Sequence, residues 1–441
     1  MNTKTEQEPG RSYRPYPEYR QSSVKWLGEV PKGWELKRLN YLMSNVVAKN
    51  TESTNDEQII ALENIEGWTG RLIEPENQKR PEGDLKVFAA GDLLFGKLRP
   101  YLAKATIASN NGLCVGEVLV LRVEDKLDNR FLLYRILTKD LIEYIDASTQ
   151  GAKMPRAEWE FIKTLPIAFP DASQQRVIAN FLDRKTALID DVIAKKQKLI
   201  ELLKEKRQAL ITQAVTKGLD PNAKLNKSGI EWLGDVPEAW EVKRLRFLSK
   251  GPFEYGANEE ASDDNPEDPR YIRITDIRED GELHSDTFRS LPIDVAKPYL
   301  LQEGDLLFAR SGATVGKTFR YKDSWGQCCY AGYLIRMRSD TRKVDSKFLH
   351  YYTLSDAYMQ WKDSVFWQAT IQNISAEKYK NFIIALPTLK EQSLIVAFLA
   401  GQTTKTDDVI GKVTVQIDKL KEYRQALITS AVTGKIDVRG E

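Results

Sequence analysis

The chain has 441 residues, of which 41% are hydrophobic and 29% are charged. That length exceeds what one domain usually holds, so two or three folded domains are expected. The formal net charge of only +2 excludes a protein that coats any polyanion, but it allows a binder with local basic patches.

The N-terminal stretch "MNTKTEQEPGRSYRPYPEYRQSS" has no apolar core, so it is not predicted to be a signal peptide. No segment approaches the ~20 apolar residues that a membrane span needs. The cysteines, Cys114, Cys328 and Cys329, form no Cys-x-x-Cys pair, and only two histidines are present. Neither a metal site nor a disulfide framework is therefore expected, and a cytoplasmic protein is predicted.

The chain repeats itself. "VKWLGEVPKGWELKRL" at 24–39 returns as "IEWLGDVPEAWEVKRL" at 230–245, and "GDLLF" at 91–95 returns at 304–308. "RQALITQAVT" at 207–216 returns as "RQALITSAVT" later in the chain. Because these features keep their order, the sequence is a duplication of one whole unit, and the period is too long for a solenoid.

Each unit opens with about 150 residues of mixed pattern. Short β-like runs occur at 116–123 and 331–338, and short helical patterns occur at 131–137 and 348–354. Gly, Asn and Asp turn signals separate them. The pattern predicts an α+β globular domain in each unit.

Each unit closes with a long helix. From Ser173 to Thr216 there is no Pro or Gly, and apolar residues recur at heptad-like spacing. A helix of this length would reach roughly 60 Å, too long for the core of one small domain. Two such helices can pair antiparallel and hold the domains at a fixed distance, with pseudo-two-fold symmetry, and Gly401 is a candidate kink or break in the second. The predicted apolar face comprises Ile178, Leu182, Ile189, Val192, Leu199, Leu203 and Leu210, a second stripe of Phe181, Leu188, Ile193 and Ile200, and Ile395, Leu399, Val409, Val413, Leu420 and Leu427.

These patterns divide the chain into seven segments. They are a flexible tail (1–22), a first globular domain (23–170), a central helical region (171–218), a linker (219–229), a second globular domain (230–388), a C-terminal helical region (389–434) and a tail (435–441).

The opening motif Trp-Leu-Gly-(Glu/Asp)-Val-Pro, the central "GDLLF" and the closing helix "QQRVIANFLDRKTALIDDVIAKKQKLIELLKEKRQALITQAVTKGLD" at 174–220 resemble those of the specificity subunits of type I restriction-modification systems. The resemblance covers nearly the whole chain from Tyr16 onward. In the second helix, "AGQTTKTDDVIGKVTVQIDKL" departs from the regular family pattern.

The resemblance implies two target-recognition domains that each read one half of a bipartite, asymmetric site in double-stranded DNA. It implies a chain with no catalysis and no bound cofactor of its own, whose helices set the unread spacer. Two methyltransferase subunits would dock on it and methylate adenine N6 with S-adenosylmethionine. Motor-nuclease subunits that use ATP and Mg²⁺ can also join such complexes.

Gly316-Lys317-Thr318 resembles the end of a nucleotide-binding P-loop. The G-x-x-x-x-G-K-[ST] pattern requires a glycine at position 311, which is Ser311. The sequence that follows also lacks a helix pattern to hold phosphate. The adenine-methyltransferase motif Asn-Pro-Pro-aromatic is absent as well, so a self-sufficient nucleotide-using enzyme is disfavoured.

The segment after "GDLLF" is basic in both units but differs in sequence, as expected of two readers of different half-sites. Arg can bind guanine as a bidentate donor, whereas Lys and Ser more often hold phosphate. The alternative is that these are ordinary solvated charges. The candidate DNA contacts here are Lys97, Arg99, Tyr101 and Lys104 in the first unit and Arg310, Ser311, Thr314 and Lys317 in the second.

A second candidate segment precedes the last strand of each domain, at 148–159 and 367–379. Lys153 and Arg156 could meet phosphate, and the amides of Gln372 and Asn373 suit adenine edges. A helix-capping turn is the alternative for the second unit.

The tryptophans of the repeated opening motif, Trp26, Trp34, Trp232 and Trp240, are predicted to pack where domain and helices meet. The motif is nearly identical in both units, so it cannot carry half-site differences. A second overall hypothesis also remains, in which the chain is a non-catalytic scaffold that binds protein partners through its helices.

Overall fold

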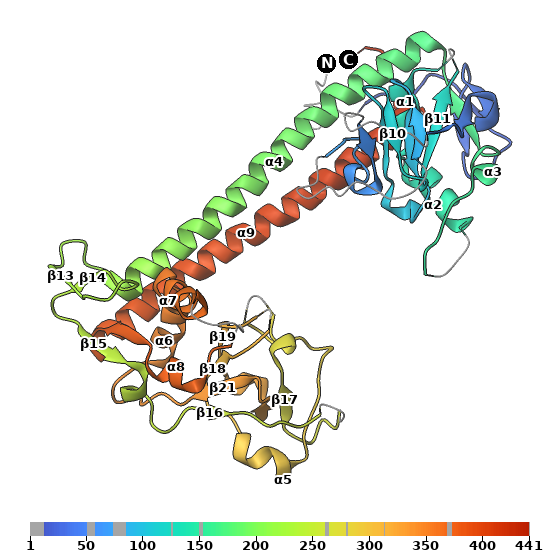
Figure 1. Cartoon of the computed structure of the whole chain (residues 1–441). Coiled ribbons are helices and arrows are strands. Elements are labelled where there is room, and N and C mark those ends of the chain that lie inside the picture. The colour runs from blue at the N-terminus through green and yellow to red at the C-terminus, as the bar shows by residue number, and fades with distance from the viewer. Residues whose placement is uncertain are drawn as a thin grey trace, which may run out of the picture. The chain divides into compact units, whose positions relative to one another are not determined.

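The computed structural model of the chain describes residues 13–50, 58–73, 85–124, 127–149, 153–260, 264–278, 281–312, 314–367 and 373–440. The chain divides into two compact units (Figure 1). The first comprises Met1–Lys196 and Val415–Glu441, and the second comprises Gln197–Thr414. Each unit therefore combines one predicted globular domain with parts of both long helices.

The first unit is a mixed domain, as the sequence predicts. Its helices are α1 (Asn129–Ile136), α2 (Lys139–Ala147) and α3 (Trp159–Ile162). Its strands are β1 (Tyr19–Gln21), β2 (Glu29–Pro31), β3 (Glu35–Arg38), β4 (Met43–Val46), β5 (Lys49–Asn50), β6 (Ile59–Ile60), β7 (Leu85–Phe88), β8 (Leu93–Gly96), β9 (Ala105–Ile107), β10 (Gly112–Cys114), β11 (Val118–Val123) and β12 (Pro166–Phe169).

These strands form two four-stranded sheets, β4-β11-β8-β9 and β5-β7-β10-β6, and two short pairs, β1-β2 and β12-β3. The first sheet is antiparallel throughout, and in the second sheet β10 and β6 run parallel. Val118, Val120 and Leu94 are buried with Phe88 in one core cluster that joins the two sheets.

The second unit repeats this frame. Its helices are α5 (Ile293–Ala296), α6 (Ser346–Thr353), α7 (Asp356–Trp367) and α8 (Ala376–Lys380). Its strands are β13 (Leu225–Lys227), β14 (Asp235–Pro237), β15 (Glu241–Arg244), β16 (Glu254–Tyr255), β17 (Arg270–Ile272), β18 (Leu306–Ala309), β19 (Thr318–Arg320), β20 (Cys328–Tyr330), β21 (Leu334–Met337) and β22 (Ile383–Leu386).

The sheet β16-β21-β18-β19 has the strand order of β4-β11-β8-β9, and the parallel pair β17-β20 matches β6-β10. The pairs β15-β22 and β13-β14 match β3-β12 and β1-β2. Among the described residues, β5 and β7 have no counterpart strand in the second unit. The duplication seen in the sequence is thus a duplication of topology.

The repeated "GDLLF" motif forms a turn and the start of β8 or β18. The aspartates of the motif, Asp92 and Asp305, are buried. Each accepts two hydrogen bonds of 2.8–2.9 Å from an arginine, Arg122 of the neighbouring strand β11 or Arg338 directly after β21. The motif therefore recurs because it closes the central sheet, not because it meets a ligand.

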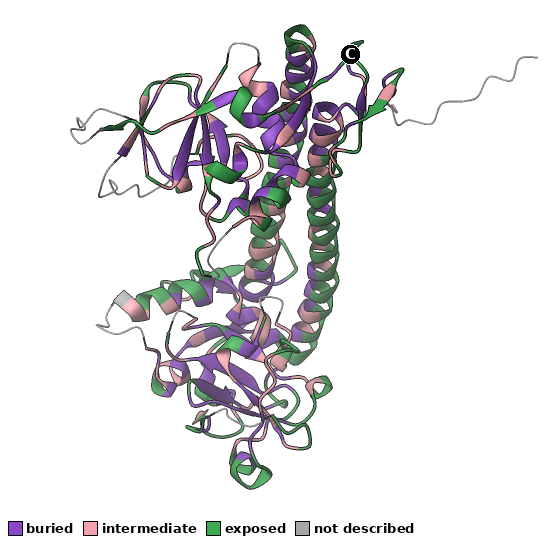
Figure 2. Cartoon of the chain, turned by 90° about the vertical axis from the view of Figure 1, so that its right-hand side faces the viewer, coloured by how far each residue is buried: buried purple, intermediate pink, exposed green. Residues whose placement is uncertain are grey.

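The long helices are α4 (Ala172–Lys217) and α9 (Leu389–Val432). The candidate break at Gly401 is absent, because α9 runs through this residue as one helix. A glycine costs about 1 kcal/mol in a helix interior, and the buried Leu399 and Thr403 on either side of Gly401 offset that cost. In Figure 2, each helix carries buried residues on one side and exposed residues over much of the rest.

The predicted apolar face of the helices needs correction. Most of its members are buried or partly buried, but Leu188, Val192, Leu199 and Val409 are between 40% and 63% exposed. The buried face instead steps through Leu182, the buried Thr186, Ile189 and Ile193, which alternates four and three residues. Leu188 and Val192 each precede a member of that face, so they lie beside it.

Polar contacts join the two helices inside each unit. In the first unit, Arg424 pairs with Asp190 at 3.0 Å, and Lys196 donates to Gln416 at 2.7 Å. In the second, Arg207 pairs with Asp407 at 3.2 Å. In the first unit, Asp190 of α4 contacts Arg424 of α9, and the later Lys196 of α4 contacts the earlier Gln416 of α9. The two helices therefore run antiparallel there.

Buried and partly buried glutamines attach each domain to the helices. Gln175 of α4 accepts the Asp128 amide at the start of α1, and Gln425 of α9 donates to the Leu137 carbonyl at its end. In the second unit, Gln392 and Gln208 make the same contacts at the two ends of α6, to the Asp345 amide and the Leu354 carbonyl.

Two predicted boundaries also need correction. The predicted flexible tail ends earlier, because residues 13–22 pack: β1 pairs with β2, and Tyr19 donates to the Gly434 carbonyl at 2.9 Å. The predicted C-terminal tail packs as well, since Val438 is fully buried and the Asp437 amide donates to Arg14. Residues 1–12 lie outside the described part of the chain.

Two of the four opening-motif tryptophans, Trp34 and Trp240, are buried, whereas Trp26 and Trp232 are partly exposed. Trp34 is buried against Tyr16 and Phe131. Trp240 is buried and donates through Nε1 to Glu391 of α9 at 3.1 Å. In the second unit the motif therefore joins the domain to α9.

The three cysteine thiols are buried, and burial raises the pKa of each to about 12. No helix in the described part of the chain combines the length and apolarity needed to cross a membrane.

Replacing Gln175 should loosen the first domain from the helices. Gln175→Ala leaves the Asp128 amide and the Pro170 carbonyl without their partner, and a buried unsatisfied group costs about 1–3 kcal/mol. We expect urea unfolding at correspondingly lower concentration. Gln197→Ala, at an exposed position of the same helix, is the control, and coincident curves for both variants would contradict the assignment.

The second unit should lose stability in mild acid through His350 on α6. Burial, with the positive charges of Arg320 and Lys322, lowers the pKa of His350 to about 4. In the unfolded chain His350 takes up a proton as the pH falls through about 6.5, whereas in the folded chain it stays neutral until about pH 4. The free energy of unfolding is therefore highest above about pH 6.5 and decreases below it. We expect a loss of about 1–2 kcal/mol between pH 7 and pH 5. His350→Gln should flatten this dependence in thermal unfolding, and an unchanged slope would refute it.

Candidate nucleic-acid interface

The first candidate loop connects β8 to β9 and contains a short 3-10 turn, Pro100–Leu102. Arg99 and Tyr101 are exposed, Tyr101 by 46%, and Lys97 is partly buried. Lys104 donates from Nζ to the Leu62 carbonyl at 2.6 Å, so its ammonium is engaged within the domain. Three of the four predicted residues thus lie on the surface or at its edge.

The backbone of this loop is strained. Arg99 and Ala103, on either side of the turn, have φ of 51° and 46°. This left-handed conformation costs about 1–2 kcal/mol for a residue with a side chain. Such conformers persist only where the surroundings hold them, and they concentrate at functional sites.

The second candidate segment lies directly beside the loop. The Ala157 amide donates to the Lys97 carbonyl at 2.9 Å, and the Arg99 amide donates to the Pro155 carbonyl at 2.8 Å. Lys153, at the start of this described segment, is exposed. The two segments predicted separately from the sequence therefore form one surface.

Arg156 on this surface is held in place by Glu117, which precedes β11. The guanidinium makes contacts of 2.9–3.2 Å to both carboxylate oxygens. Hydrogen bonds from Arg156 and the charge of Glu117 raise the pKa of the arginine. The side chains remain 38% and 31% exposed, so Arg156 is oriented yet reachable from outside.

The second unit brings its two candidate segments together in the same way. The Ile374 amide donates to the Arg310 carbonyl at 2.9 Å, and Ser311 forms an isolated antiparallel β-bridge with Asn373. The Arg310 guanidinium lies 4.8 Å from the ring centre of Tyr255. The Nε of Arg310 and the Oδ1 of Asn373 are buried and have no hydrogen-bond partner in the described part of the chain.

The remaining predicted residues of this loop fall at its turn. Thr314 is partly buried and its carbonyl accepts the amide of Lys317, whose side chain is exposed. Gln372 lies outside the described residues. The predicted helix-capping alternative holds for Ser375, whose side chain accepts the Lys378 amide at the start of α8.

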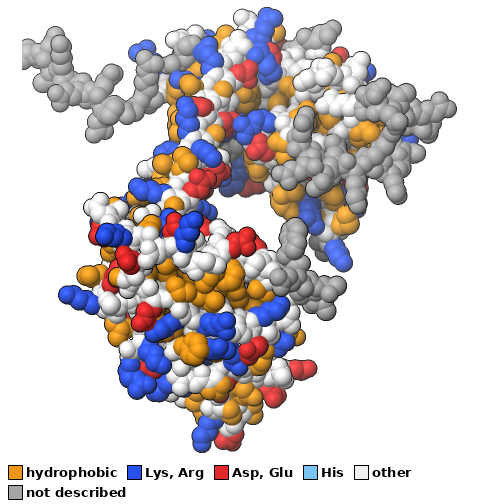
Figure 3. Space-filling model, turned by 60° about the vertical axis from the view of Figure 1, so that its left-hand side comes forward, with side chains coloured by type: hydrophobic (Ala, Val, Ile, Leu, Met, Phe, Trp, Pro, Cys, Tyr) orange, Lys and Arg blue, Asp and Glu red, His pale blue; other side chains and the backbone are white. Residues whose placement is uncertain are grey.

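Equivalent places in the two frames carry different side chains. Where the Lys97 amide donates to the Glu117 carbonyl, the Arg310 amide donates to the Tyr333 carbonyl. Tyr333 is 67% exposed. Figure 3 shows Lys and Arg side chains mixed with hydrophobic ones on one face of the second unit, in the lower part of the view.

Sequence reasoning missed Glu117, Tyr255 and Tyr333 as members of these surfaces. A signal was available for two of them, because Glu117 and Tyr333 lie near the start of the predicted runs 116–123 and 331–338, immediately before the observed strands β11 and β21. Tyr255 lies far from the loops in sequence, and only the pairing of β16 with β21 brings it near.

The Gly-Lys-Thr sequence does not form a nucleotide-binding P-loop. Thr318 begins β19 instead of a helix. The Gly316 amide donates to Ala309, and its carbonyl accepts the Tyr358 hydroxyl at 2.7 Å. The backbone groups that would cradle a phosphate are therefore used within the domain.

The chain is thus a tandem protein in which one α+β frame appears twice with different surface side chains. A family model described as "Type I restriction modification DNA specificity domain" matches residues 32–202 and again 237–418. These two matches cover most of the chain, so the chain belongs to this family.

Two similar proteins are named as specificity subunits of type I restriction enzymes. The type I restriction enzyme MjaVIII specificity subunit of Methanocaldococcus jannaschii is 21% identical over 430 residues, which cover 93% of this chain and 94% of that protein. The EcoKI specificity subunit of Escherichia coli K12 is 24% identical over 324 residues, covering 72% and 68%.

A solved structure described as "Structural basis underlying complex assembly and conformational transition of the type I R-M system" matches with a TM-score of 0.71. It is 19% identical and covers 91% of this chain and 98% of that one. At this identity, the match supports the fold.

Proposed function

We propose that the chain is the non-catalytic, DNA-reading subunit of a type I restriction-modification complex. Each domain reads one half of a bipartite, asymmetric site in double-stranded DNA. The complex methylates adenine N6 through two methyltransferase subunits that bind S-adenosylmethionine and flip the target base out of the duplex. Motor-nuclease subunits that use ATP and Mg²⁺ join the same complex.

One observation carries the proposal: the two units share a backbone frame but differ in the side chains at its two adjoining surface segments. Lys97, Glu117 and Arg156 in the first unit are replaced by Arg310, Tyr333 and Asn373 in the second. A structural role would favour the same residues in both places, as it does for the "GDLLF" aspartates. Reading two different half-sites requires the difference.

The chemistry of these side chains suits DNA. Arg can donate two hydrogen bonds to guanine O6 and N7, and the amide of Asn373 can pair with adenine N6 and N7. The exposed Lys317 is placed at a turn where it can neutralise a phosphate. Arg156, oriented by Glu117, presents its free edge with little entropy left to lose.

We also propose that α4 and α9 pair as an antiparallel coiled coil with pseudo-two-fold symmetry and set the unread gap between half-sites. The pairing of Arg424 with Asp190 in the first unit and of Arg207 with Asp407 in the second supports it, because the same repeat positions meet in both. Two half-sites on a fixed spacer are the usual target of such an arrangement.

The methyltransferase subunits would bind an exposed apolar stripe on α4. Leu188, Val192, Leu199 and Leu202 step by four, seven and three residues and are 63%, 40%, 43% and 49% exposed. Heptad spacing places them on one side of the helix, beside the buried face. Exposed apolar stripes of this kind mark sites of protein association.

Phosphate contact predicts a measurable salt dependence. The affinity for DNA falls as salt rises, so a plot of log affinity against log salt has a negative slope. In the assembled complex, Lys97→Ala and Lys317→Ala should each make that slope shallower by about 0.9, because each variant loses one phosphate contact. Fluorescence anisotropy with a random-sequence duplex measures this slope. Lys227→Ala, an exposed lysine on β13, should leave it unchanged. Wild-type slopes in both loop variants would favour the scaffold hypothesis.

Docking on the stripe predicts that Leu188→Glu and Leu199→Glu weaken binding of the methyltransferase partner by at least about tenfold, since each buries a charge at an apolar contact. Gln197→Glu adds the same charge to an exposed position of α4 away from the stripe. Titration calorimetry would measure all three variants. If Gln197→Glu weakens binding as much as the stripe variants do, the stripe is not the docking surface.

A further inference from the structure

The segment Glu66–Arg71 of the first unit lies directly against the candidate DNA loop. The Trp68 amide donates to the Ala103 carbonyl at 2.9 Å, and the Thr106 hydroxyl donates to the Gly70 carbonyl at 2.8 Å. Gly67 leaves no space for a side chain, because a Cβ there would lie 2.3 Å from the Leu102 carbonyl oxygen. The conformation of the segment and that of the loop therefore depend on each other.

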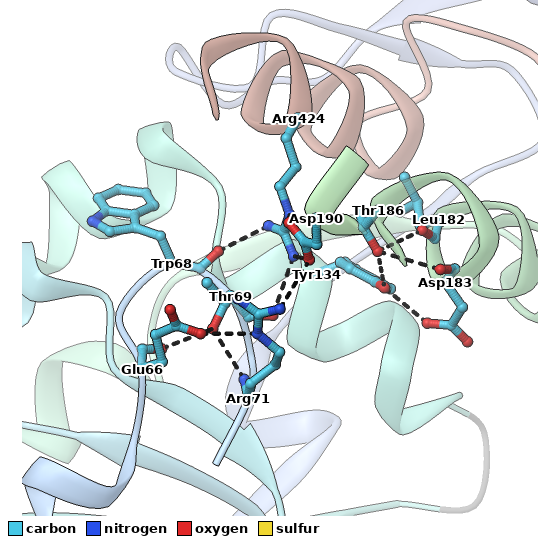
Figure 4. A network of polar contacts seen from close by, with 10 residues as sticks. All are labelled: Glu66, Trp68, Thr69, Arg71, Tyr134, Leu182, Asp183, Thr186, Asp190 and Arg424. Carbon is cyan, nitrogen blue, oxygen red and sulfur yellow. Dashed lines mark hydrogen bonds and ion pairs between the residues drawn. The ribbon is translucent and has the colours of Figure 1, made fainter. Parts of the chain in front are cut away.

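The same segment is held from its other side by the C-terminal helix (Figure 4). Arg424 of α9 donates from Nη1 to the Trp68 carbonyl at 3.1 Å and from Nη2 to the Thr69 carbonyl at 3.4 Å. Its Nε donates to Asp190 of α4 at 3.0 Å. Arg71 adds a contact of 3.6 Å to Asp190 and bonds Glu66 at 2.8 Å. The Arg424 side chain is only 8% exposed.

Strained backbone conformations occur at three residues of the segment and the loop, Trp68, Arg99 and Ala103. The described residues other than glycine with positive φ are Ser23, Trp68, Arg99 and Ala103. Trp68 contacts both Arg424 and Ala103, and Arg99 and Ala103 flank the loop turn. Strained conformers need their surroundings to hold them, and Arg424 bonds the carbonyl of one of these residues.

The second unit offers the matched comparison. Arg207 occupies the same place in the repeated "RQALIT" motif and pairs with Asp407. Its Nε lies 3.2 Å from the Asp407 carboxylate, but among the described residues of that unit Arg207 has no bond to a loop carbonyl like those that Arg424 makes. The loop there is held instead by its own domain, through the Tyr358 hydroxyl of α7 on the Gly316 carbonyl. The link from helix to loop through a strained segment is thus a feature of the first unit.

We propose that Arg424 is a positioning residue for base recognition by the first domain. Its guanidinium fixes the carbonyls of Trp68 and Thr69, and through Ala103 these fix the loop of residues 97–104. The planar fork of arginine serves two carbonyls and a carboxylate at once, which the single ammonium of lysine cannot do in the same geometry. The C-terminal helix thereby contributes to the specificity of the N-terminal domain. This inference rests on the proposed DNA-reading function.

The test compares Arg424→Lys with Arg207→Lys, each in the complex with its methyltransferase partner. Single-molecule sequencing of N6-methyladenine in cells gives the base preference at each half-site. Exchange of residues 23–170 for those of a relative identifies the half-site of the first domain. We expect Arg424→Lys to accept additional bases in that half-site only, with several-fold lower methylation of the original site. Arg207→Lys should leave both preferences unchanged.

The outcomes separate the two proposals. A wild-type complex without a bipartite motif refutes the proposed function itself. A wild-type motif that Arg424→Lys leaves unchanged, or relaxes equally in both halves, refutes the positioning role alone.

The positioning role of Arg424 can also be tested without DNA. Hydrogen exchange of the Leu102 and Ala103 amides, which bond within the loop, should accelerate in Arg424→Ala and not in Arg207→Ala. Unchanged exchange in Arg424→Ala overturns the proposal even if that variant is less stable.

Discussion

Each long helix carries, near its C-terminal end, an Arg-Gln pair on which the arrangement of each unit depends. Arg424 reaches Asp190 on the other helix while Gln425 bonds the end of α1. Arg207 and Gln208 repeat both contacts in the second unit. A single dipeptide thus joins helix to helix and helix to domain, and it accounts for the identity of "RQALIT" in the two copies.

With that joint fixed, the two domains are free to differ only where they face outward. The aspartates of "GDLLF" and the second tryptophan of each opening motif, Trp34 or Trp240, are buried in both units, and they are residues that repeat. The segments around Arg156 and Asn373 share backbone pairing but not chemistry. A constant frame that presents variable side chains suits the proposed pair of DNA readers.

Much of this could be predicted from the sequence, because repeats and periodicity are local signals. The strand β11, the helix α1 and the full extent of α4 follow from them. Other features depend on partners remote in the chain. Packing offsets the cost of Gly401 within α9, and strand pairing alone brings Tyr255 beside Arg310. The candidate site was therefore predicted as two separate segments, and their union is a tertiary result.

The proposed function requires that this chain reads two unlike half-sites for a methyltransferase. Single-molecule sequencing of N6-methyladenine in cells with and without the gene, with the methyltransferase partner intact, tests it most directly. We expect a two-part motif with a fixed unread gap to lose methylation when the gene is deleted. Unchanged methylation at every motif, in cells that express an active partner, would contradict it.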